Sequence, residues 1–318
     1  MSNQSLPILR EQMPIAIQAA GDSAKFAWEE FFYAKIRSEH TRRAYMRAVR
    51  FFLYWCELQA IGLTQISPAH VGLYLDRIHV ATASKKQILA ALRHFFDGMV
   101  TRHAMALNPA LSVRTERYAV VEGKTPEITV KQARLLLQSI DTTNVIGLRD
   151  KSIISILIYT AARIGAISRL RVRDLYDSGD QYCLHFVDKG GKSREIPVRH
   201  DLQRLLFDLL KERSQGRIYH SDLPLFTTFA GRTQVPTIRA MTANDIGRMV
   251  KRRMSAAGLP RRLSPHSFRV ATITDLLTQG VPLEDVQNLA GHADPRTTRL
   301  YDRRKMAITR NIVERISI

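Results

Sequence analysis

The sequence is poor in cysteine, and this scarcity excludes several classes of protein. Among 318 residues there are two cysteines, Cys56 and Cys183, too few for a disulfide framework or a cysteine-based zinc site. The chain also lacks any run of about 18 apolar residues, so we expect no membrane span. Its first residues, MSNQSLPILREQ, lack the basic-then-apolar layout of a signal peptide. We therefore expect a protein of the reducing cytoplasm.

Acidic residues are scarce relative to basic ones. The chain has 29 Asp and Glu against 48 Lys and Arg, a net charge of +19, and its pI is about 10.4. Residues 128–318 hold 32 basic and 18 acidic side chains, whereas residues 1–127 hold 16 and 11. This balance favours a polyanionic partner such as nucleic acid, bound more strongly by the second half. A merely solubilising basic surface is the alternative.

Hydrophobic spacing predicts a mainly α protein of two domains. Residues 1–22 show little periodicity and are interpreted as an N-terminal extension. Residues 23–112 hold four amphipathic helical segments, which is typical of a compact all-α domain. Residues 113–128 are polar and carry no helical stripe, so we expect an interdomain linker.

Residues 129–318 predict a mostly helical second domain with one small antiparallel sheet. Two β-rich runs flank the sequence KGGK at 189–192, which is a hairpin signal. An apolar helix precedes them and is expected to end at Arg163. Helical patterns follow at 201–213, 242–257, 265–279, 282–290 and from 295 onward.

The stretch RRLSPHSFRVATITDLLTQG carries the start and stop signals of a helix. Ser264 suits the N-cap, Pro265 the first helical position and Gly280 the end. His266 and Arg269 then share a face near the helix N-terminus, where free N–H groups favour an anion. The pair is either a phosphate clamp or a capping histidine beside a surface arginine.

A tyrosine stands among arginines in LAGHADPRTTRLYDRR, residues 289–304. Gly291 closes one predicted helix and the Asp-Pro that follows starts another, so His292 lies in the turn between them. Tyr301 lies about two helical turns into the second helix. Both side chains can reach one cleft, although a tyrosine at the edge of the core explains the pattern equally well.

Two further residues are ambiguous alone. Arg163 ends an apolar run, so we expect it half-buried and partnered, and an internal ion pair is as good an explanation as a site. Lys189 lies in a Gly-rich turn, where most lysines are simply solvated.

Together these residues carry the chemistry of metal-free phosphoryl transfer. A tyrosine hydroxyl is the nucleophile, arginines and a histidine stabilise charge on the phosphate oxygens, and a lysine protonates the leaving oxygen. The set is Arg163, Lys189, His266, Arg269, His292 and Tyr301.

The order of these residues resembles the tyrosine recombinases, also called the phage-integrase family. The matching segments are TAARIGAISRLRVRDL, DKGGKSREIPV, SPHSFR and LAGHADPRTTRLYDR, and HTRRAYMRAVRFFLYWC resembles the family's core-binding domain. The resemblance spans roughly residues 24–310. It implies a helical, SAM-like core-binding domain and a mostly helical catalytic domain that together clamp duplex DNA.

The resemblance also implies a mechanism. Tyr301 would attack a DNA phosphate and form a 3′-phosphotyrosyl link, releasing a 5′-hydroxyl. Arg163, Arg269 and His266 would hold the phosphate, Lys189 would be the general acid and His292 would assist. The family acts without metal, ATP or other cofactor, as a tetramer on two specific recombination sites through a Holliday junction. We expect a monomer in free solution, a nucleoid-associated location and possible accessory DNA-bending or directionality factors.

The sequence departs from the family at one position and leaves others open. Ala166 stands where the family often has an acidic residue. We expect no separate arm-binding domain, since the core-binding helices begin near residue 24. The C-terminal isoleucines are expected to dock on a neighbouring protomer or to pack on their own domain; they are Ile308, Ile312 and Ile316.

Contacts to DNA are predicted from basic residues on two helices, and phosphate contacts should dominate them. They are Arg42, Arg43, Arg47, Lys85 and Lys86. Two other functions remain open: a DNA-binding accessory protein with a degenerate site, and a type IB topoisomerase-like nicking and closing enzyme. The complete six-residue set disfavours the first, and the two-domain layout disfavours the second.

Overall fold

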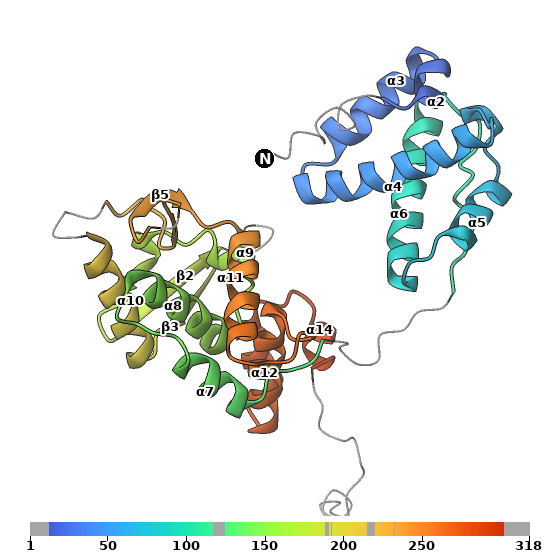
Figure 1. The fold of residues 1–318 in the computed structure, drawn as a ribbon. Coiled ribbons are helices and arrows are strands. Elements are labelled where there is room, and N and C mark those ends of the chain that lie inside the picture. The colour runs from blue at the N-terminus through green and yellow to red at the C-terminus, as the bar shows by residue number, and fades with distance from the viewer. Residues whose placement is uncertain are drawn as a thin grey trace, which may run out of the picture. The chain divides into compact units, whose positions relative to one another are not determined.

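The computed structural model describes residues 13–116, 125–187, 191, 193–214, 220–231 and 233–301. The chain forms two compact units, Met1–Ala119 and Val120–Ile318, which are described separately (Figure 1). The architecture is mainly helical with small antiparallel sheets, and the predicted fold class is confirmed. No helix in the described ranges is long and apolar enough to span a membrane.

The first unit is a helical domain with an aromatic core. Phe95 and Phe96 of its last helix are fully buried and pack against Phe32 and Phe52 from two other segments. Ile17, inside the stretch predicted as an extension, is also fully buried in this core. The elements are α2 (Ile15–Ala19), α3 (Asp22–Glu29), the π-helical η1 (Glu30–Lys35), α4 (Glu39–Leu58), η2 (Leu63–Gln65), α5 (Pro68–Arg77) and α6 (Thr82–Thr101).

The second unit is built around one apolar helix. Helix α8 (Val145–Thr160) has most of its residues buried, and it packs against α7 (Val130–Gln138), α10 (His200–Ser214), α11 (Ala243–Ala256) and α12 (Pro265–Thr278). The other helical elements of this unit are α9 (Ile164–Ile167), η3 (Val172–Asp174), α13 (Leu283–Ala290) and α14 (Pro295–Arg299).

Helix α8 ends earlier than the sequence suggested. Its last residue is Thr160, because Ala161 adopts a left-handed conformation with φ of 49°. Arg163 therefore does not end α8; it is the N-cap of the short helix α9. The apolar run hid this break, since it contains no glycine or proline at the point where the helix stops.

The described residues of the second unit form two antiparallel sheets, where the sequence indicated one. The predicted hairpin is present as β2 (Tyr182–Val187) and β3 (Ser193–Pro197), with Val187 opposite Ser193. Strand β1 (Leu175–Asp177) extends this sheet on the other side of β2. The second sheet pairs β4 (Thr227–Phe229) with β5 (Pro236–Ala240). These strands were missed because they are only three and five residues long.

A buried ion network ties α8 to α11. Both oxygens of the fully buried Asp150 are used: Oδ1 accepts from Arg149 at 2.6 and 3.0 Å, and Oδ2 accepts from Arg253 Nε at 2.9 Å. Arg149 also donates to the Thr227 carbonyl at 3.1 Å. Each buried charge in this network therefore faces an opposite charge.

Candidate active site

Arg269 is the centre of the predicted site. It lies on α12, its side chain is 1% exposed, and its two terminal nitrogens donate to backbone carbonyls. Nη1 reaches the Ala161 carbonyl at 2.5 Å and Nη2 reaches the Ala290 carbonyl at 2.6 Å. These carbonyls lie at the C-terminal ends of α8 and α13, where helices leave carbonyls unpaired and carry partial negative charge.

No carboxylate pairs with Arg269 in the described part of the chain, and its buried Nε makes no hydrogen bond there. Burial lowers its pKa to about 10, and the nearby charge of Arg163 acts in the same direction, whereas Tyr301 opposes them. The guanidinium thus stays charged at neutral pH. Arg269 is thus a buried cation, and its Nε–H group can donate a hydrogen bond to an anion.

Tyr301 lies against the two predicted histidines. Its hydroxyl oxygen is 3.1 Å from His266 Nε2, and its ring stacks on His292 with centroids 5.6 Å apart and planes 16° from parallel. The residue is 9% exposed and packs on a small apolar cluster that includes Val270 and Ile273 of α12. Tyr301 therefore packs at the edge of the apolar core and also lies beside two residues of the predicted site. The two interpretations of its position are compatible.

The backbone of Tyr301 is also fixed. Its amide N–H donates to the Thr298 carbonyl at 3.0 Å, and its carbonyl accepts from the Thr274 hydroxyl at 3.3 Å. Asp294 caps α14 by accepting from the Arg296 amide at 2.8 Å. The chain just before Tyr301 is thus held against α12, which carries His266 and Arg269.

His266 lies in the first turn of α12, next to its N-cap Ser264. His266 is partly exposed, and its Nε2 lies 3.1 Å from the Tyr301 hydroxyl oxygen in a partly buried contact. Desolvation lowers the pKa of His266, and the charges of Arg269 and Arg163 lower it further. A neutral imidazole in this place can accept the proton of the Tyr301 hydroxyl.

His292 is buried and held in one orientation. Its Nδ1 lies 2.9 Å from the hydroxyl oxygen of Thr298, and its backbone exchanges hydrogen bonds with Gln287 at 3.0 and 3.1 Å. Burial lowers the pKa of His292 to about 3, aided by the charges of Arg269 and Arg163. The ring is therefore neutral at physiological pH.

The side chain of Arg163 is exposed, whereas the sequence predicted that it would be half-buried. It is the N-cap of α9 outside the apolar helix, so the core does not enclose it. Its charge is nevertheless close enough to lower the pKa of His266, Arg269 and His292. Ala166, where the family often has an acid, is 4% exposed and packs in the apolar core.

Two predicted features lie outside the described residues. Lys189 lies in the sequence between β2 and β3, in a segment of which the structure describes only Gly191. The three C-terminal isoleucines also fall outside, because the description ends at Tyr301. The described set therefore brings together His266, Arg269, His292 and Tyr301, with the charge of Arg163 nearby.

Sequence reasoning missed two residues that contact this cluster. Thr298 fixes His292 Nδ1, and Arg194 on β3 contacts the end of α13. Thr298 lies one helical turn before Tyr301, a spacing that signals a shared helix face. Arg194 had no comparable signal, because its partners lie far away in sequence.

The predicted DNA-contacting residues lie on α4 and α6. Arg43 and Arg47 are exposed; Arg43 pairs with Glu39, and the guanidinium of Arg47 lies 5.6 Å from the Phe51 ring centre. Arg42, Lys85 and Lys86 are partly buried. Their contacts with DNA stay a prediction.

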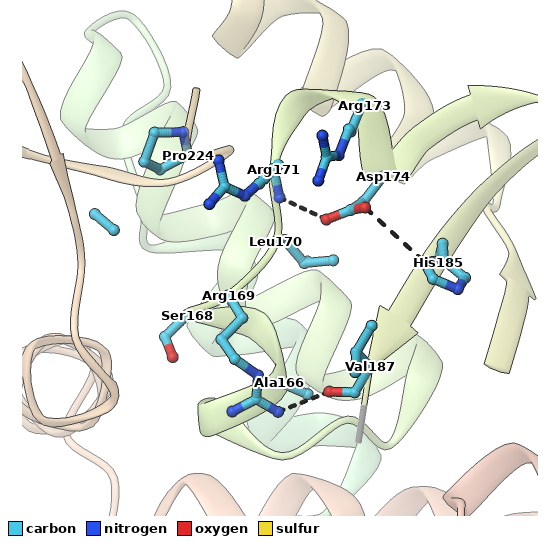
Figure 2. A pocket seen from close by; sticks show the side chains of 11 residues that line it. Ala166, Ser168, Arg169, Leu170, Arg171, Arg173, Asp174, His185, Val187 and Pro224 are labelled. Carbon is cyan, nitrogen blue, oxygen red and sulfur yellow. Dashed lines mark hydrogen bonds and ion pairs between the residues drawn. The ribbon is translucent and has the colours of Figure 1, made fainter. Parts of the chain in front are cut away.

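A basic hollow of about 540 Å³ lies beside α9. Figure 2 shows Arg169, Arg171 and Arg173 around it. Arg169 donates to the Val187 carbonyl at 2.7 Å, Arg171 to the Asp222 carbonyl at 2.7 Å, and Arg173 pairs with the Asp222 carboxylate. These arginines join neighbouring segments of the chain.

Across the described ranges, no group of three or more His, Cys, Asp or Glu residues is arranged to hold a metal.

Comparison with known proteins fits this geometry. The profile described as "Phage integrase family" matches residues 126–307, and "Phage integrase, N-terminal SAM-like domain" matches residues 27–103. Tyrosine recombinase XerD of Listeria monocytogenes is 27% identical over 278 residues, covering 83% of this chain and 88% of the relative. Tyrosine recombinase XerC of Myxococcus xanthus is 28% identical over 271 residues, covering 83% and 87%.

Solved structures share the fold. XerH site-specific recombinase bound to a palindromic difH substrate has a TM-score of 0.66 at 20% identity, covering 82% of this chain and 75% of that one. A lambda integrase dimer bound to a COC′ core site has a TM-score of 0.64 at 17% identity, covering 90% and 98%. With the family profile spanning more than half of the sequence, the chain belongs to the phage integrase family, the tyrosine recombinases.

Proposed function

We propose that this protein is a site-specific DNA recombinase that cuts and rejoins DNA through a 3′-phosphotyrosyl intermediate. The observation that carries the proposal is the Tyr301 hydroxyl, 3.1 Å from His266 Nε2 and adjacent to the buried, charged Arg269. A nucleophile beside a neutral base and a cation without a carboxylate partner suits attack on a phosphodiester.

The first step forms one bond and breaks one. The Tyr301 oxygen attacks the scissile phosphorus while His266 accepts the hydroxyl proton. Arg269 and Arg163 stabilise the charge on the non-bridging oxygens, and His292 donates a hydrogen bond to one of them. The bond from phosphorus to the 5′-oxygen breaks, and Lys189 protonates that oxygen.

The second step reverses the first with a different strand. A 5′-hydroxyl from the partner DNA attacks the phosphotyrosine, and Tyr301 leaves with its proton restored. One phosphodiester is exchanged for another, so the cycle needs no ATP and uses no metal. Strand exchange between two sites then passes through a Holliday junction.

The partner we propose is double-stranded DNA with a specific recombination site. The net charge of +19 and the DNA-bound structures of XerH and lambda integrase support it. The active assembly would be a tetramer in the synapse formed from monomers in solution, in the cytoplasm. We also propose that 23–112 is the core-binding domain, 113–128 the linker and 129–318 the catalytic domain.

A nicked suicide substrate tests the proposal, once the bound site has been mapped in the source genome. Because the nick lets the short fragment that bears the released 5′-hydroxyl diffuse away, wild-type protein should accumulate a covalent adduct. Tyr301→Phe should bind the same DNA and form none. No adduct from wild type on its mapped site would favour the degenerate DNA-binding protein. Adducts without exchange between two sites would favour a topoisomerase-like enzyme.

A further inference from the structure

The guanidinium of Arg194 joins the same two helix ends that Arg269 joins. Its Nη1 donates to the Leu289 carbonyl and lies 3.4 Å from the Thr160 carbonyl. Arg269 binds the next carbonyl along each segment, at Ala161 and Ala290. Two arginines from separate elements, β3 and α12, thus bind consecutive carbonyls at the ends of α8 and α13.

Arg194 is itself held in place by the sheet. It lies opposite Phe186 in the β2–β3 pairing, and its guanidinium stands 5.2 Å from the centre of the fully buried Phe186 ring. Strand β3 therefore presents a fixed cation to the helix ends. The His292 turn begins directly after them, at Gly291.

We propose that Arg194 is a positioning residue that sets the geometry of Arg269 and His292 around the scissile phosphate. It fixes the separation of the α8 and α13 ends, so the Arg269 fork meets the Ala161 and Ala290 carbonyls and its Nε remains available for a phosphate oxygen. The inference rests on the proposed phosphoryl transfer. It assigns Arg194 to the stabilisation of charge on the non-bridging oxygens, not to protonation of the leaving oxygen.

The chain offers a matched control. Arg213, at the end of α10, is also buried and also donates through its fork to two consecutive carbonyls, those of Pro224 and Leu225. Those carbonyls do not belong to the cluster around Tyr301. Arg213→Gln removes a comparable structural clamp and leaves the proposed one intact.

The test compares two scissile groups in the suicide substrate: the natural phosphate and a methylphosphonate, in which one charged oxygen is replaced by a methyl group. On phosphate, Arg194→Gln should slow adduct formation by about 100-fold, as a misplaced catalytic group does. On the methylphosphonate, which carries less charge to stabilise, the deficit should be about tenfold smaller. Arg213→Gln should show the same ratio to wild type on both substrates.

A third substrate and a double variant make the inference falsifiable. A 5′-bridging sulfur supplies a leaving group that needs little protonation, so rescue of Arg194→Gln by sulfur would place Arg194 on the leaving-group side and overturn the inference. Equal loss on phosphate and methylphosphonate would overturn it as a general folding defect. In an Arg269→Gln background, Arg194→Gln should add little, and full additivity would contradict a shared role. Absence of adduct from wild type would contradict the proposed function instead.

Discussion

Two buried arginine clusters of the second unit differ in how their charge is neutralised. Around Asp150, the guanidinium groups of Arg149 and Arg253 meet a carboxylate with no exposed surface. Around Arg269, the guanidinium meets the carbonyl ends of two helices and no carboxylate in the described ranges. In the first cluster each guanidinium has an anionic partner, although two of them share one carboxylate. In the second the guanidinium has no anionic partner within the described ranges, so an incoming phosphate can take that place.

The comparison separates stability from activity. Carbonyl dipoles hold Arg269 in place and do not cancel its charge, whereas an acidic partner would lower its affinity for phosphate. Because Arg269 has no carboxylate partner in the described ranges, its charge should matter more for cleavage than for folding. The paired charges around Asp150 should matter more for folding than for cleavage.

The largest effect is expected on the cleavage rate when the charge of Arg269 is removed. Arg269→Gln should lower the rate of adduct formation by about 100- to 1,000-fold, because charge on the phosphate oxygens loses its closest cation. Its free energy of unfolding should change far less than that of a variant in the Asp150 cluster. Single-turnover cleavage and urea unfolding measure the two quantities. A loss of stability large enough to explain the lost activity would break the comparison.

The next largest effect is expected on stability. Asp150→Ala leaves two buried or half-buried guanidinium groups without their carboxylate, which should cost about 3–5 kcal/mol in the free energy of unfolding. Asp222→Ala, which breaks an exposed pair with Arg173, is the control and should cost under about 1 kcal/mol. Urea unfolding measures both. Equal costs would show that burial of the Asp150 network does not matter.

The smallest effect, taken per pH unit, concerns the dependence of stability on pH. Because the pKa of His292 in the folded protein is about 3, well below its value of 6.5 in the unfolded chain, unfolding takes up a proton between these pH values. His292 therefore makes the folded protein less stable as pH falls. Its contribution lowers the free energy of unfolding by about 1.4 kcal/mol for each pH unit in this window.

Replacing the histidine tests this contribution. Thermal or urea unfolding between pH 4 and 6 should show a shallower decline for His292→Asn than for wild type by about one proton. An unchanged slope would mean that the ring is already protonated in the folded protein. It would also remove the basis for a neutral His292 in the site.

Much of this site could be predicted from sequence because its residues follow local signals. Ser264 and Pro265 mark the start of α12. Because the helix begins there, His266 and Arg269 lie on one of its faces. Gly291 ends α13 in a left-handed conformation and so places His292 in a turn. Such signals act over a few residues and are visible in a single sequence.

The parts that could not be predicted depend on distant partners. Arg163 is exposed because α8 stops at Ala161, a residue whose left-handed backbone no local rule announces. Arg194 contacts Leu289 across 95 positions of sequence, and its role is visible only once β3 and α13 are placed together. The strands β4 and β5 were missed because strands of three and five residues carry little periodicity.

The most direct test of the account identifies the residue that becomes bonded to DNA. Adduct from the nicked substrate is digested with protease and nuclease, and the peptide that retains a nucleotide is sequenced by mass spectrometry. The account predicts a 3′-linked nucleotide on Tyr301, absent from Tyr301→Phe and strongly reduced in Arg269→Gln. A nucleotide on another side chain, or adduct formation that persists in Tyr301→Phe, would contradict it.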